Sequence, residues 1–125
     1  MIPLLAVLLG GALGSALRLT IDLALPHPAD GFPVGTLLIN LAGSFALGML
    51  VARVWPTARP WLRAGLGPGL LGSFTTFSAI ALSVVQLATL GSGLLALAYL
   101  AATLAGGLGA AALGIRIGRR REAPA

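Results

Sequence analysis

Four long apolar stretches, separated by short polar or turn-rich breaks, dominate the hydrophobic pattern of the chain. They run over about 3–25, 32–54, 62–90 and 94–117. A helix needs about 20 mostly apolar residues to cross a bilayer, so each stretch is long enough, and the third is too long for a straight span. The pattern predicts an all-α membrane protein with one four-helix transmembrane domain, followed by a polar cytoplasmic tail at 118–125.

Composition agrees with a membrane protein and excludes several classes of chemistry. Of the 125 residues, 58% are hydrophobic and 9% are charged, whereas soluble domains have roughly 25% charged residues. Cysteine is absent and His27 is the only histidine, so thiol chemistry and cysteine-type metal sites are excluded. Without paired carboxylates in a span or a nucleophile–histidine–acid set, we do not expect an enzyme. Without a basic helix or an aromatic platform, we expect no nucleic-acid partner.

The net charge is +5, and all of the positively charged side chains are arginines. Their placement predicts the topology. Arg53, Arg59 and Arg63 flank the break between the second and third spans. A second group flanks the C-terminus: Arg116, Arg119, Arg120 and Arg121. The other two breaks contain no Lys or Arg. The positive-inside rule therefore predicts that both termini and the middle loop are cytoplasmic.

Small residues recur at helix-packing spacing on two of the spans. Gly10 and Gly14 form a GxxxG pair in the first span. The fourth span carries a continuous i, i+4 series: Ala98, Ala102, Gly106, Ala110, Gly114 and Gly118. Such residues let helix backbones approach closely in lipid. The two readings are packing within the bundle and a dimer face.

A polar break interrupts the third span at Gly72–Ser78, where four hydroxyl side chains accompany Phe74 and Phe77. At membrane depth, polar groups and irregular backbone persist only where they are buried in protein or line a wet cavity. The segment therefore predicts a helix that is broken near its middle. Freed carbonyls at such a break can hold a cation, and freed amides and hydroxyls can hold an anion.

Other polar groups in the spans are mostly hydrogen-bond donors. Arg18 lies in the first span, Asn40 in the second, and Tyr99 and Thr103 lie at i and i+4 in the fourth. An intramembrane charge indicates a functional site, although Arg18 could also snorkel to the interface. Asn40 could instead make a structural interhelical hydrogen bond. Because no acid occupies a span centre, the set favours an anion, which the positive ring edge of Phe77 could also face.

Three motifs in order resemble those of the Fluc/CrcB family of fluoride ion channels. They are GGALGxxxR at 10–18, GTLLINLAGSF at 35–45 and GSFTTFS at 72–78. The resemblance covers the whole chain and implies an antiparallel, dual-topology-type dimer with two fluoride pores and a central structural sodium ion. It also implies a multi-pass protein of the bacterial plasma (inner) membrane, which exports fluoride from the cytoplasm to reduce its toxicity.

Carried onto this chain, the resemblance assigns residues to each site. The sodium ion would be held by the backbone carbonyls of Gly72 and Thr75. The fluoride pore would be lined by Asn40, Phe77, Ser78, Tyr99 and Thr103, with Arg18 in an aqueous vestibule. Fluoride and sodium would thus be the bound ions, and the lipid bilayer the surrounding medium.

Two departures from the family pattern bear on the assembly and on the pore. Ile80 stands where a second phenylalanine is usual, three residues after Phe77. The arginine bias favours a single orientation, so the dimer could be a homodimer or a heterodimer with a homologous chain of opposite bias. The alternatives are a non-conducting subunit of such a heterodimer, and a small drug or cation exporter resembling the small multidrug resistance family. Those exporters need a glutamate in the first span, where this chain has Arg18.

Overall fold

The computed structural model describes residues 1–28 and 30–119, and four of its helices are long and apolar enough to cross a membrane. They are α1 (Ile2–Ala24), α2 (Val34–Met49) with its π-helical continuation η1 (Leu50–Val54), a composite helix over Pro60–Thr89, and α6 (Gly93–Arg119). At 1.5 Å per residue, the 23 residues of α1 extend about 34 Å, enough for a hydrocarbon core of about 30 Å. The expectation of an all-α fold with four long apolar helices is confirmed.

The third of these helices is interrupted, as its sequence predicts. It begins with α3 (Pro60–Ala64), continues as the π-helical segment η2 (Gly65–Leu71) and α4 (Gly72–Phe74), and resumes after the break as α5 (Ser78–Thr89). Pro68 lies inside η2 and has no amide to donate, which favours an irregular ladder there. At Thr75 the backbone is extended, with φ −81° and ψ 156°. The break therefore lies at 75–77, within the Gly72–Ser78 segment.

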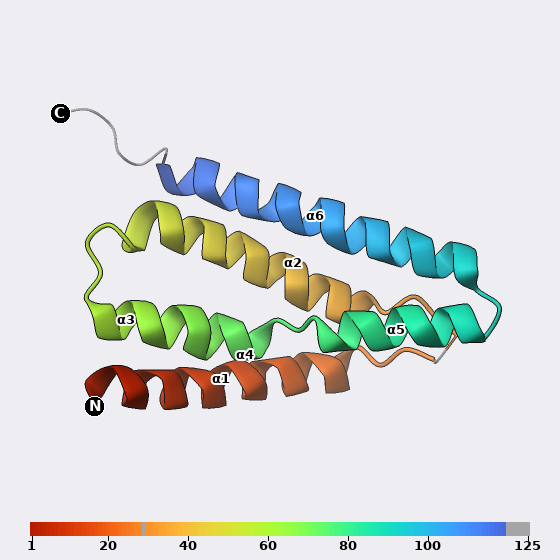
Figure 1. Cartoon of the computed structure of the whole chain (residues 1–125), viewed down its shortest axis with the longest axis horizontal. Helices are drawn as coiled ribbons and strands as arrows, with labels where there is room; N and C mark the ends of the chain where they lie inside the picture. The colour runs from red at the N-terminus through yellow and green to blue at the C-terminus, as the bar shows by residue number, and fades with distance from the viewer. Residues whose placement is uncertain (29, 120–125) are drawn as a thin grey trace.

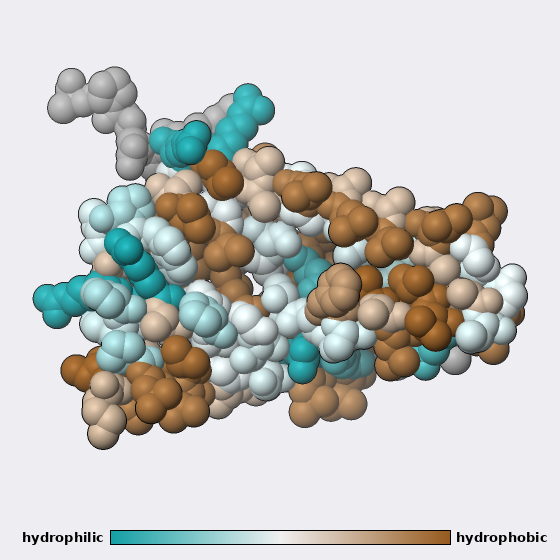
Figure 2. All heavy atoms as spheres, in the orientation of Figure 1, coloured by the Kyte–Doolittle hydropathy of each residue, from teal (hydrophilic) through white to brown (hydrophobic). Residues whose placement is uncertain are grey.

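The helices lie in antiparallel rows (Figure 1). In Figure 1, the start of α1, the end of α6 and the connection between η1 and α3 are at one end, and the connections α1–α2 and α5–α6 are at the other. Figure 2 shows hydrophilic side chains gathered mainly at the end where α1 begins, while hydrophobic side chains cover much of α5 and α6 on this face. Arg53, Arg59 and Arg63 flank the η1–α3 connection and thus share this end. The orientation of that end toward the cytoplasm stays a prediction.

Close helix packing within the chain accounts for the small-residue series. A methyl group at Gly10 would overlap the carbonyl oxygen of Gly65, and one at Gly14 would overlap that of Leu70. On α6, a methyl group at Gly114 would overlap the carbonyl oxygen of Phe45. These glycines let α1 lie against η2 and α6 lie against α2 at backbone contact. Of the two readings, the structure supports packing within the bundle at these positions.

Element boundaries differ little from the expected ones. The third helix covers Pro60–Thr89 where 62–90 was expected, and α6 reaches Arg119 where 117 was expected. Gly91 follows α5 with a left-handed φ of 81°, a conformation that glycine adopts without strain, and it turns the chain into α6. The predicted tail at 118–125 lies outside the described residues from position 120 onward.

Candidate functional site

The side chain of Asn40, on α2, bonds to the backbone at the break in the third helix. Its Oδ1 accepts a hydrogen bond from the Thr76 amide at 2.9 Å, and its Nδ2 donates to the Thr76 carbonyl at 3.1 Å. Asn40 is 9% exposed, so this pair of hydrogen bonds satisfies backbone groups that the broken helix leaves without partners. Asn40 therefore makes the structural interhelical hydrogen bond that the sequence analysis gives as one of its possible roles. We call this arrangement the Asn40–Thr76 clamp.

Gly72 and Thr75 are among the residues at the break whose carbonyls lose their usual helical partners. In a continuous helix the amide of Thr76 would bond to the carbonyl of Gly72, and the amide of Ala79 to that of Thr75. Here the Thr76 amide donates to Asn40, and the Ala79 amide donates to the Oγ1 of Thr76 at 3.2 Å. The carbonyls of Gly72 and Thr75 are therefore released from the i to i+4 ladder, while the Thr75 hydroxyl bonds back to the Leu71 carbonyl at 2.7 Å.

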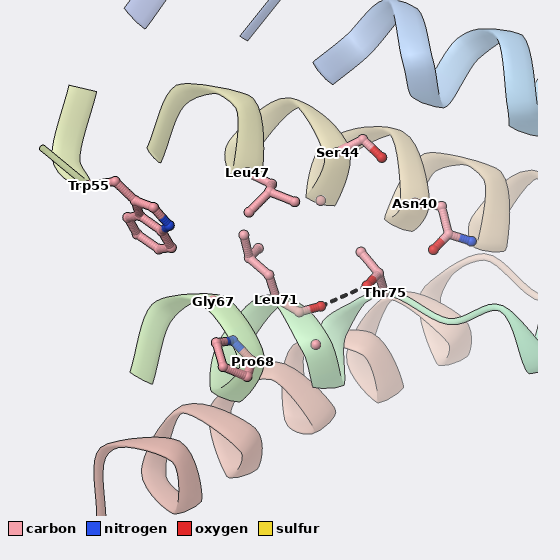
Figure 3. A pocket seen from close by; sticks show the side chains of 10 residues that line it. Asn40, Ser44, Leu47, Trp55, Gly67, Pro68, Leu71 and Thr75 are labelled. Atoms are coloured by element: carbon pink, nitrogen blue, oxygen red, sulfur yellow. Dashed lines mark hydrogen bonds between the residues drawn. The ribbon is translucent and has the colours of Figure 1, made fainter. Parts of the chain in front are cut away.

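A cavity of about 460 Å³ opens on one side of the break (Figure 3). We call it the Trp55 cavity, because Trp55 lies at one end and Asn40 and Thr75 at the other in Figure 3. Its lining residues come from α2, the third helix and Trp55: Asn40, Gly43, Ser44, Leu47, Trp55, Gly67, Pro68, Leu71, Gly72 and Thr75. Both proposed sodium ligands and one proposed pore residue therefore border the same space.

A second cavity, of about 320 Å³, reaches the break from the other side. We call it the Arg18 cavity, and its lining is more polar: Arg18, Asp22, Thr36, Thr76, Ser78, Ala79 and Leu82. Along α2, Thr36 lies one turn before Asn40, whereas the residues of the Trp55 cavity lie at Asn40 and beyond it. The two cavities thus approach the Asn40–Thr76 clamp from opposite directions along the helix axes.

Four buried hydroxyl side chains from three helices meet beside these cavities. The Tyr99 hydroxyl faces those of Thr36, Ser83 and Thr103. Tyr99 is fully buried, and although these hydroxyls lie near one another, neither that of Tyr99 nor that of Thr103 makes a hydrogen bond of good geometry within the described part of the chain. Buried polar groups are normally hydrogen-bonded, so these two hydroxyls keep unused capacity for a small polar guest. The Tyr99 ring is fixed by an edge-to-face contact with Phe32, with ring centroids 5.4 Å apart.

Phe77 lies apart from the other predicted pore residues. Its side chain is 78% exposed and lines neither cavity, whereas Ile80 one turn later is 7% exposed. Within a single chain, the fold brings Arg18 and Ser78 together in the Arg18 cavity. The fold places Tyr99 and Thr103 among the four buried hydroxyl side chains, and it places Asn40 at the Asn40–Thr76 clamp.

Several polar residues of these sites were missed by the sequence analysis. Thr36 and Ser44 lie four residues before and after Asn40, so all three share one face of α2, and this spacing was visible in the sequence. Asp22 lies four residues after Arg18 in the same way. Ser83 carried no comparable signal, because only the packing of α5 against α6 brings its hydroxyl to Tyr99.

Known proteins resemble this chain over nearly its whole length. A protein of Chelativorans sp. (strain BNC1) named "Fluoride-specific ion channel FluC" is 44% identical over 123 residues, which cover 95% of this chain and 98% of that protein. Proteins of the same name from Paracoccus denitrificans and Deinococcus radiodurans are 41% and 45% identical, over 92% and 90% of this chain and 93% and 91% of theirs.

The family match includes every element described above except the start of α1 and the end of α6. Residues 5–115 match the family described as "CrcB-like protein, Camphor Resistance (CrcB)". With four membrane-spanning helices, the polar break and these relatives, the chain is a multi-pass membrane protein that belongs to the CrcB family.

Proposed function

We propose that this protein is a fluoride-specific ion channel, which lets fluoride leave the bacterial cytoplasm and so reduces its toxicity. The observation that carries the proposal is the pair of cavities, one with a polar and charged lining, that meet at the Asn40–Thr76 clamp in the middle of a membrane domain. Irregular backbone that lines a cavity at this depth is typical of an ion path. The names of the relatives from Chelativorans and Paracoccus agree with it. A channel of this kind is not an enzyme.

The donors along the proposed route suit a small, strongly hydrated anion. Fluoride can leave its water only where the protein offers hydrogen-bond donors in exchange. Arg18 would attract the ion into its cavity, and the exposed Ser78 hydroxyl lies on the same wall. Asn40 uses one amide hydrogen on Thr76, which leaves its second hydrogen for a guest. Tyr99 and Thr103 supply two further hydroxyls without partners.

A second chain is needed to bring Phe77 into the pore. A phenylalanine with 78% exposure beside a polar break would face lipid or another protein. We propose that an antiparallel partner covers this face and that Phe77 then turns its positive ring edge toward the anion. Ile80 is buried in its own chain, so the second aromatic ring of the usual pore is absent here.

The released carbonyls fit the structural sodium site that the family resemblance implies. Gly72 and Thr75 line the Trp55 cavity, and the amides that would occupy their carbonyls donate elsewhere. Sodium favours such unwound carbonyl oxygens, and when bound it would hold the two broken helices of a dimer together. We expect dimers of the purified protein to dissociate at lower temperature when sodium is replaced by N-methylglucamine. Equal dimer stability in both salts would contradict the sodium site.

Fluoride efflux from liposomes tests the channel directly. The purified protein is reconstituted, and fluoride release is followed with a fluoride-selective electrode. We expect rapid efflux, a large loss for Phe77→Ile, and no loss for Leu94→Ile, a control at another strongly exposed apolar position. No efflux from the chain alone or with a co-expressed homologue would refute the proposed function. Export of a cationic dye in place of fluoride would favour the drug-exporter alternative.

The arginine bias motivates a separate test of the assembly. If the chain inserts in one orientation only, an antiparallel dimer requires a homologous partner of opposite bias. Termini mapped in cells would then lie on one side, and efflux would require co-expression. Equal insertion in both orientations with efflux from the chain alone would establish a homodimer and exclude the heterodimer and the non-conducting subunit.

A further inference from the structure

Asp22 occupies the junction of two polar cavities at the end of α1. It lines the Arg18 cavity, and it also lines a neighbouring cavity of about 340 Å³ that includes His27 and Gln86. The two cavities share the same four wall residues: Asp22, Thr36, Ala79 and Leu82. A solute that moves between them therefore passes the Asp22 side chain, which is exposed.

The charge of Asp22 opposes that of Arg18 in the same space. The two residues are four positions apart on α1, so their side chains project from the same helix face, and both border the Arg18 cavity. Asp22 is also the only carboxylate within the helices that the structure describes. A cationic vestibule raises the local anion concentration, and a carboxylate one turn away lowers it again.

The opposite end of the molecule carries no such carboxylate in the described part. Arg53 and Arg63 lie at the end where α1 begins and α6 ends, and among the described residues that end has no Asp or Glu. Within this part of the chain, the anion path that we propose thus has one mouth with arginines alone and one where an acid accompanies Arg18. The two mouths differ in the potential that an approaching anion meets.

We propose that Asp22 sets the rate of fluoride passage by limiting the fluoride concentration in the Arg18 cavity. The inference rests on the proposed function, because it assumes that fluoride uses this cavity. Asp22 acts on the ion through its field, without contact with it. A negative charge in this cavity lowers its occupancy by fluoride and so slows passage of the ion.

The test compares charge variants in the fluoride-conducting preparation at several ionic strengths. The Debye length falls from about 30 Å at about 0.01 M salt to about 3 Å at about 1 M, so a field effect must fade across this range. We expect Asp22→Asn and Asp22→Ser to raise fluoride efflux about 2–5-fold at low salt, with the gain largely lost at about 1 M. Asp22→Glu should keep the original rate. Asp30→Asn removes a carboxylate that lines neither cavity and serves as the control.

Each outcome separates this inference from the proposed route. An unchanged rate for Asp22→Asn, a change that does not depend on salt, or an equal gain for Asp30→Asn would overturn the role of Asp22. If Arg18→Gln slows efflux at low salt while Asp22→Asn does nothing, the route stands and the inference fails. If Arg18→Gln has no effect either, fluoride does not use this cavity, and both ideas fail. Gel-filtration profiles and thermal stability check that each variant is folded.

Discussion

Replacing Asn40 by alanine should release the broken helix from α2. The substitution removes both hydrogen bonds of the Asn40–Thr76 clamp, at 2.9 Å and 3.1 Å. Each such bond contributes about 1 kcal/mol net, and leaving a buried backbone partner unsatisfied costs about 1–3 kcal/mol for each group. Thr76 lines the Arg18 cavity, where water can replace the lost partners, so the loss falls toward the lower end of these ranges. We expect Asn40→Ala to lower the free energy of unfolding by about 2–3 kcal/mol.

Unfolding of the purified protein in detergent, followed by circular dichroism, measures this loss. Ser44→Ala is the matched control, because Ser44 lines the Trp55 cavity one turn away and makes no bond to the break. Asn40→Asp retains an acceptor for the Thr76 amide, but it buries a carboxylate against the Thr76 carbonyl oxygen, which it cannot pair with, so its stability should be at or below that of the alanine variant. The same preparations, assayed for fluoride efflux, show whether the position of the break also matters for conduction.

One result would refute this reasoning, and another would limit the role of Asn40 to stability. If Asn40→Ala unfolds like Ser44→Ala, within about 0.5 kcal/mol, the two hydrogen bonds do not hold the break. If Asn40→Ala is destabilised while efflux is unchanged, the clamp is structural, and the amide of Asn40 has no part in the ion path.

Two further predictions concern α6. Gly114→Ala should destabilise the fold by about 1–3 kcal/mol, because the added methyl group overlaps the Phe45 carbonyl and must push α2 away. Gly109→Ala is the control and should cost no stability, because no atom lies within 4 Å of its new methyl group. Equal unfolding midpoints for the two variants would contradict the close packing of α6 on α2. Tyr99→Phe removes a buried hydroxyl that has no hydrogen-bond partner among the described residues, so it should leave the stability unchanged or raise it by about 1 kcal/mol. Fluoride efflux should decrease if that hydroxyl binds the ion. A clear loss of stability would mean that the hydroxyl is bonded to a group or water in the folded protein.

The hydrophobic pattern by itself determined the number of helices and the position of the break. Four apolar stretches of sufficient length leave no other way to satisfy the backbone in lipid, and four hydroxyls with Gly72 in the third stretch are incompatible with an unbroken lipid-facing helix. The positions of Arg18, Asn40, Tyr99 and Thr103 as unusual polar groups in the spans were also visible from the sequence.

Only the tertiary structure decided what these polar groups do. Asn40 satisfies both backbone groups of Thr76 because α2 lies opposite the break, and this contact joins residues 36 positions apart. Tyr99 meets Thr36 and Ser83 because α2 and α5 both pack against α6, and Phe77 is left exposed at the start of α5. A linear sequence specifies which residues are polar at membrane depth. Which polar groups satisfy one another, and which stay free for an ion, depends on how the helices pack.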